Sequence, residues 1–170
     1  MVQSLVIALI AAFASLINLS VGMGHLRVSM GIIVMIVALH QRKELNPIST
    51  SVLAGFAVFL MRLIVTSVGG TISTNIALSY LLEVLFYIGY GVLYEFLERK
   101  DVEKYNNPLI LILMICDFGA NAIELASRYF ILGDNLQNFT FPNLFIAAFV
   151  RSAIIWILIR IFNKNSLKDN

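Results

Sequence analysis

Six runs of mostly apolar residues take up most of this chain, at about 3–22, 26–41, 47–68, 75–98, 108–132 and 141–162. A helix that crosses a bilayer needs about 20 such residues, because each adds about 1.5 Å across a hydrocarbon core of roughly 30 Å. Charged residues make up only 13% of the 170 residues, whereas a soluble domain carries about 25%. The sequence therefore predicts an all-α integral membrane protein with a single six-helix transmembrane bundle over 1–170. It excludes an ordinary soluble enzyme and a nucleic-acid-binding protein.

Basic residues gather in three segments on one side of such a bundle, namely Arg42 and Lys43, then Arg99, Lys100 and Lys104, then Arg160, Lys164 and Lys168. The opposite segments, 69–74 and 133–140, contain no Lys or Arg. Short loops rich in Lys and Arg stay in the cytoplasm. We therefore expect a multi-pass protein of the cell membrane with both termini cytoplasmic.

The second apolar run is short and begins in the glycine-rich stretch 22–27. Glycine relaxes backbone restrictions, so we expect part of this stretch to be non-helical. His40, at the inner end of the run, is interpreted as a residue of the membrane interface.

Ionisable residues inside the runs are the main clue to function, since each costs about 2.5 kcal/mol or more to insert and normally has a partner. They are Arg62, Glu83, Asp117, Glu124, Arg128 and Arg151. Counting residues from the cytoplasmic ends of the helices puts Arg62 and Glu83 at one depth, and Asp117 and Arg151 at another. The sequence therefore predicts the ion pairs Arg62–Glu83 and Asp117–Arg151.

The fifth run places four polar residues on one helical face, because Asp117, Asn121, Glu124 and Arg128 are spaced 4, 3 and 4 apart. Such a face looks into the bundle or into a cavity. One interpretation is a salt-bridge network that fixes helix packing, and the other is the wall of a ligand pocket open to the outside. Both hold if Asp117 and Arg151 are structural while Glu124 and Arg128 lie nearer the ligand.

The expected pocket lies toward the outer side. Arg27 is a cation on the side that is otherwise poor in cations, and it lies beside His25 among glycines. This position favours binding of a polar or anionic group. The predicted ligand-binding set is Arg27, Arg62, Glu83, Glu124, Arg128, Asn121 and His25.

Catalytic chemistry is not indicated. The sequence has no HExxH motif, no glycine-rich phosphate loop and no cluster at metal-ligand spacing. The single cysteine, Cys116, lies in an apolar run and cannot form an internal disulfide. We expect no enzyme activity, no metal and no cofactor.

Six spans in about 170 residues, with polar groups in the outer half, resemble the S component of energy-coupling factor transporters. These are small substrate-binding membrane subunits. In that family an AxxxA-type motif of the first helix docks on a transmembrane coupling subunit that works with cytoplasmic ATPases. Ala8 and Ala12 stand at this spacing, and small residues allow close approach of helices. The resemblance implies uptake of a vitamin-like polar or anionic ligand from the outer side. The family's aspartate and glycine-proline signatures are absent from the second and third runs.

A second resemblance is to the membrane input region of clostridial-type sensor histidine kinases. It rests on the segments 27–31, 59–62 and 116–118, with Asn121, Glu124 and Arg151. It implies a ligand sensor linked to a kinase domain that lies outside this chain. A third possibility is a structural membrane assembly protein, in which the buried charges are fully paired and no cavity exists.

Overall fold

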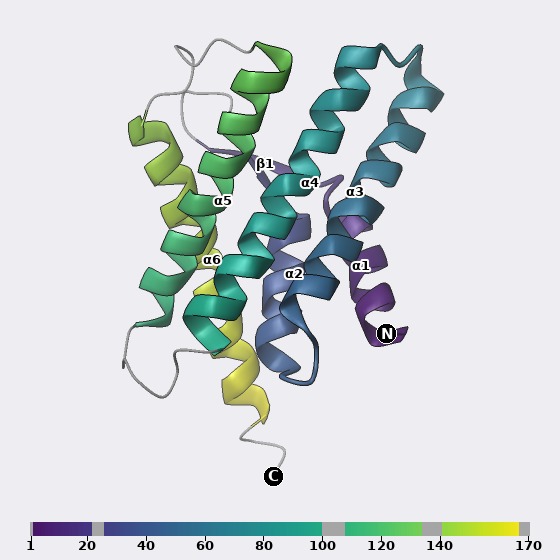
Figure 1. The fold of residues 1–170 in the computed structure, drawn as a ribbon. Coiled ribbons are helices and arrows are strands. Elements are labelled where there is room, and N and C mark those ends of the chain that lie inside the picture. Colours follow the sequence, from purple (N-terminus) through teal and green to yellow (C-terminus); the bar gives the residue numbers. More distant parts are fainter. Residues whose placement is uncertain (1, 22–25, 100–107, 134–140, 167–170) are drawn as a thin grey trace.

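The computed structural model describes the backbone of residues 2–21, 26–99, 108–133 and 141–166, and the side chains of these residues except 18–28, 141, 143, 165 and 166. The elements in chain order are α1 (Val2–Ala14), β1 (Asn18–Val21), β2 (Leu26–Ser29), α2 (Met30–Gln41), α3 (Pro47–Gly69), α4 (Thr74–Tyr94), the π-helical turn η1 (Glu95–Arg99), α5 (Leu109–Leu132) and α6 (Phe141–Ser166). We call the end with the α3–α4 connection, 70–73, the upper end. The end with the α2–α3 connection, 42–46, is the lower end (Figure 1).

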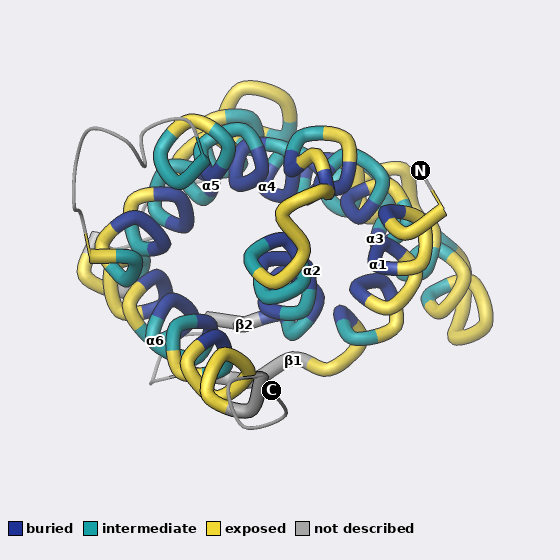
Figure 2. Tube along the Cα trace, turned by 90° about the horizontal axis from the view of Figure 1, so that it is seen from below, coloured by how far each residue is buried: buried dark blue, intermediate teal, exposed yellow. Residues whose placement is uncertain are grey.

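Five helices form a ring around α2. Figure 2 shows α1, α3, α4, α5 and α6 arranged around α2, which stands in the middle of the bundle. Successive ring helices contact each other from α1 to α3 and onward to α6, while α2 contacts α1, α3 and α6. The core of the protein is therefore centred on α2, which the surrounding helices largely bury.

The four long helices confirm the character of a helical membrane protein. Each of α3, α4 with η1, α5, and α6 from Leu144 to Lys164 is long and apolar enough to cross a membrane. Their bounds agree with the predicted runs to within a few residues. The ends are capped as the sequence suggests, with Asn46 accepting a hydrogen bond from the Ser49 amide at 3.0 Å and Ser73 accepting from Ile76 at 3.3 Å.

The two remaining helices are shorter than predicted. α1 ends at Ala14, where the expected span continued to 22, and α2 begins at Met30, where the expected span began at 26. At about 1.5 Å per residue, the 12 residues of α2 extend over only about 18 Å, roughly half of a hydrocarbon core. In Figure 1, α2 accordingly occupies the lower half of the ring.

An antiparallel β-ribbon replaces the missing helical turns. The register pairs Asn18 with Ser29 and Ser20 with Arg27, and β2 contacts α6. The sequence alternates polar and apolar residues along both strands, and this period of two is typical of a strand. Ser29 ends the ribbon and caps α2, since its hydroxyl accepts a hydrogen bond from the Gly31 amide at 3.3 Å.

At the lower end, Arg99 of η1 ties α4 to the end of α2. Its guanidinium donates to the backbone carbonyls of Leu39 at 2.8 Å, Lys43 at 2.9 Å and Arg42 at 3.3 Å, and also to that of Leu45. The final carbonyls of a helix have no partner within the helix. Arg99 supplies such partners and fixes the α2–α3 connection against α4.

Candidate functional site

Both ion pairs predicted from depth are present in the ring. Arg62 Nη1 of α3 lies 2.5 Å from Glu83 Oε2 of α4. Arg151 Nη1 of α6 lies 2.7 Å from Asp117 Oδ2 of α5. With the pair Glu124–Arg128 on α5, these residues form a group that we call the polar cluster, and it joins all four long helices.

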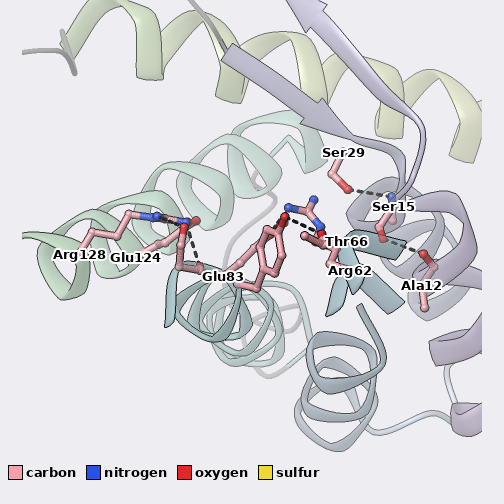
Figure 3. Close-up of polar contacts among 11 residues, drawn as sticks. Ala12, Ser15, Ser29, Arg62, Thr66, Glu83, Glu124 and Arg128 are labelled. Carbon is pink, nitrogen blue, oxygen red and sulfur yellow. Dashed lines mark hydrogen bonds and ion pairs between the residues drawn. The ribbon is translucent and has the colours of Figure 1, made fainter. Parts of the chain in front are cut away.

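The first part of the polar cluster lies between α3 and α4. Beside the Arg62–Glu83 pair, the Arg62 guanidinium carbon lies 5.8 Å from the centre of the Tyr80 ring. The Tyr80 hydroxyl lies 3.0 Å from the Thr66 hydroxyl, which extends the polar contact toward the upper end. Figure 3 shows Arg62, Thr66 and Glu83 converging between the two helices.

Arg128 joins α5 to α4. Its Nε donates to Glu124 Oε1 at 2.8 Å (Figure 3). Its Nη1 donates to the Ser79 hydroxyl at 2.6 Å and its Nη2 to the Ser79 carbonyl at 3.1 Å. Ser79 and Arg128 also border a cavity of about 230 Å³ near the upper end, which is lined by Asn75, Ile76, Ser79, Arg128 and Leu132. Arg128 is therefore both a helix-to-helix contact and part of a cavity wall.

The Asp117–Arg151 pair is less exposed to solvent than the other two ion pairs. The Asp117 side chain is 0% exposed and that of Arg151 is 6% exposed, against 15–22% in the other pairs. Asn121 donates to Asp117 Oδ1 at 2.7 Å, and the Arg151 guanidinium lies 5.0 Å from the centre of the Phe86 ring. This geometry fits the structural role predicted for Asp117 and Arg151.

Tyr87 lies at the boundary between the polar cluster and the central helix. It is 1% exposed, and its hydroxyl has no hydrogen-bond partner among the described residues. That hydroxyl faces Gly31, where an added Cβ would stand 2.6 Å from it. Tyr90, one turn further along α4, instead donates to the Leu113 carbonyl at 3.3 Å.

Sequence reasoning missed Ser79, Tyr80 and Thr66, which extend the contacts of the cluster. Spacing offers a signal, because Ser79, Glu83 and Tyr87 follow one another at intervals of four and so lie on one face of α4. Uncharged polar residues are common in helices, so this signal becomes informative only once Arg128 is known to face α4.

Two of the predicted ligand-binding residues have no described side chain. His25 lies outside the described residues, and Arg27 belongs to β2, where only the backbone is described. The register places Arg27 opposite Ser20 in the ribbon. The binding roles of both side chains stay predictions.

The docking role expected of Ala8 and Ala12 is not supported by their position. They are 0% and 1% exposed within the chain itself, on the side of α1 that packs into the bundle. Small residues on this side of α1 allow close packing against α2 within the same chain. The packing is so close that a Cβ added at Gly31 would stand only 2.6 Å from the Ala11 carbonyl oxygen. The outward face of α1 carries larger apolar residues, among them Leu9 and Phe13.

In the described part of the cluster, each of the three arginines contacts one carboxylate, so the formal charges balance. A balanced set of donors and acceptors suits a polar or zwitterionic ligand better than a purely anionic one. The described residues contain no group of three His, Cys, Asp or Glu side chains that could hold a metal ion. The chain matches no protein-family model, no curated protein and no solved structure.

Proposed function

We propose that the protein is a membrane-embedded module that binds a polar small molecule from the outer side, in the manner of an S component. The observation that carries the proposal is the half-length central helix. α2 fills only the lower half of the ring (Figure 1), and the ion pairs Arg62–Glu83 and Glu124–Arg128 lie on the upper halves of α3, α4 and α5. A ring of membrane helices with a polar upper interior offers a ligand hydrogen-bond partners away from lipid.

Within this site, the more exposed pairs Arg62–Glu83 and Glu124–Arg128 contact the ligand. Their side chains retain 15–22% exposure and supply both donors and acceptors. Asp117 and Arg151 hold α5 against α6 below them. Uptake then requires a coupling subunit with cytoplasmic ATPases, as the resemblance to S components implies.

Access of solutes to the polar cluster from the outer side is tested with 2-sulfonatoethyl methanethiosulfonate, a negatively charged thiol reagent that does not cross membranes. The variants are Asn121→Cys and Ala120→Cys, each in a Cys116→Ala background that removes the only native cysteine. Asn121 is partly exposed within the cluster, whereas Ala120 is 0% exposed on the next position of the same helix. We expect the reagent to modify Asn121→Cys in intact cells and to leave Ala120→Cys unmodified.

A compound screen then follows on the purified wild-type protein, with vitamins and amino acids as probes and melting temperature as the readout. A binding compound should raise the melting temperature and should slow modification of Asn121→Cys. It should have no such effect on the doubly neutralised variant Arg62→Met with Glu83→Gln.

A specific observation favours a second candidate, a structural assembly protein. Every arginine and carboxylate of the described cluster already has a charged partner, as expected of a network that only fixes helix packing. Under that function Asn121→Cys would be as unreactive as Ala120→Cys in a folded protein.

A further inference from the structure

A second polar cavity lies at the lower end of the bundle, far from the polar cluster. It has a volume of about 300 Å³ and lies where α2, the start of α5 and the end of α6 meet. Its lining residues are His40, Pro108, Leu109, Ile110, Trp156, Ile159, Arg160 and Asn163. The proposed function makes no use of this cavity.

The polar part of the lining is rich in hydrogen-bond donors. The Arg160 guanidinium lies 4.9 Å from the centre of the Trp156 ring, and among the described residues no carboxylate pairs with it. The Asn163 side-chain carbonyl oxygen accepts a hydrogen bond from Gln41 at 2.9 Å, and its NH₂ group has no acceptor among the described residues. A cation and amide donors together suit a phosphate oxygen.

Neighbouring groups add to the polar character of the cavity. His40 Nδ1 lies 3.0 Å from the Tyr94 hydroxyl and 3.7 Å from Glu98 Oε1, which leaves Nε2 on the other side of the ring. The first turn of α5, with Leu109 and Ile110 in the lining, has no side-chain cap at Pro108. The amide end of a helix carries a partial positive charge, which reinforces the effect of Arg160.

The remaining lining is apolar, which distinguishes this cavity from a binding site for a water-soluble ligand. Leu109, Ile110 and Ile159 form its walls beside the Trp156 ring. Elsewhere on the surface of α6, Ile157 and Ile161 are exposed apolar side chains. A ligand that fits both parts has a charged head and an apolar body.

We propose that this cavity binds the phosphate of an anionic phospholipid, with Arg160 and Asn163 on the phosphate and the acyl chains along α5 and α6. The lower end carries the basic residues Arg42, Lys43 and Lys164, whose positive charge is complementary to an anionic leaflet. Tryptophan and arginine are also the residues that anchor helices at a membrane interface. Soluble phosphate esters and phospholipids share the phosphate group, and in this proposal the phosphate bound here belongs to a phospholipid.

Trp156 gives a direct test because it is the only tryptophan of the chain. The full chain is reconstituted in bilayers that contain increasing fractions of brominated phosphatidylglycerol or brominated phosphatidylcholine, and quenching of tryptophan fluorescence is measured. One Arg near an anionic surface favours binding by about 1 kcal/mol, so phosphatidylglycerol should quench with about five-fold higher apparent affinity. Equal quenching by the two lipids would overturn the proposal.

Two variants locate the effect. Arg160→Gln should reduce the preference for phosphatidylglycerol to near parity, and Arg160→Lys should retain part of it. Lys164→Gln is the matched control, since Lys164 lies one turn further along α6, is exposed and is not in the lining. The preference should survive in that control. An unchanged preference in Arg160→Gln would show that general surface charge attracts the lipid, and the proposal would be wrong.

A soluble source is tested in the same assay with glycerol phosphate and inorganic phosphate at millimolar concentrations. Neither should change Trp156 fluorescence or displace brominated phosphatidylglycerol. Displacement by either compound would assign the cavity to a soluble phosphate ester and overturn the lipid proposal. Because the cavity lies at the opposite end from the polar cluster, these outcomes are independent of the accessibility of Asn121.

Discussion

At Gly31, α1, α2 and α4 pack tightly against one another. A Cβ added there would stand 2.6 Å from the Ala11 carbonyl oxygen and 2.6 Å from the Tyr87 hydroxyl. The first of these is backbone and cannot turn away, so Gly31→Ala should lower the free energy of unfolding by about 1–3 kcal/mol. Gly69→Ala is the control, because nothing lies within 4 Å of the position of its added Cβ. Melting of the two variants in detergent checks the prediction, and equal melting temperatures would contradict it.

The Asp117–Arg151 pair makes a sharper prediction about charge. Removal of one partner leaves the other buried without compensation, so Asp117→Asn or Arg151→Met alone should destabilise the protein by about 3–5 kcal/mol. The double variant should recover most of this loss, because it leaves no unpaired charge. Denaturant titration of the four proteins measures the coupling, and additive losses would contradict it.

At the level of elements, η1 acts as a clamp on the α2–α3 connection through Arg99. Arg99→Gln removes the charged donor that contacts four backbone carbonyls. We therefore expect trypsin to cut after Arg42 and Lys43 several-fold faster than in wild type, because local opening exposes the connection. The control is Glu95→Gln, which changes a charge in the same turn but not the donor to these carbonyls. Equal cleavage of both variants would mean that the clamp does not hold the connection closed.

The sequence predicts the long helices better than the region before them. Apolar length and capping residues such as Asn46 define α3 to α6, because a membrane span must be apolar over most of its length. Residues 16–21 also have an apolar average, so they resemble the end of a first span. The alternation of polar and apolar residues in Asn18–Val21 indicates a strand, but only four residues carry it. The pairing with Leu26–Ser29 then decides the structure.

The same limit applies to the polar cluster. Depth along a helix predicts the Arg62–Glu83 and Asp117–Arg151 pairs, since ionic partners in lipid must lie at equal heights. Depth does not show which helices are neighbours, so the contact between Arg128 and Ser79 could not be predicted. The central position of α2 likewise depends on packing among all the helices.

For the whole molecule, sidedness in the membrane does not depend on whether α1 and α2 cross it. α1 begins and α2 ends in the lower half, with the ribbon between them, so the pair enters and leaves on one side (Figure 1). The four long helices that follow are even in number and return the chain to that side. Both chain ends are therefore expected on the side of the basic residues, which is the cytoplasmic side.

Labelling of single cysteines tests this orientation. In a Cys116→Ala background, Thr71→Cys lies in the α3–α4 connection and Lys164→Cys near the end of α6, and both positions are exposed. A membrane-impermeant maleimide added to intact cells should label Thr71→Cys, while Lys164→Cys should need permeabilised cells. The reverse pattern would place the polar cluster on the cytoplasmic side. A ligand could then not reach the cluster from outside, which would contradict the proposed function. The cavity beside Trp156 would face the outer leaflet, and the basic residues of the lower end would lie on the side where the positive-inside rule expects few of them.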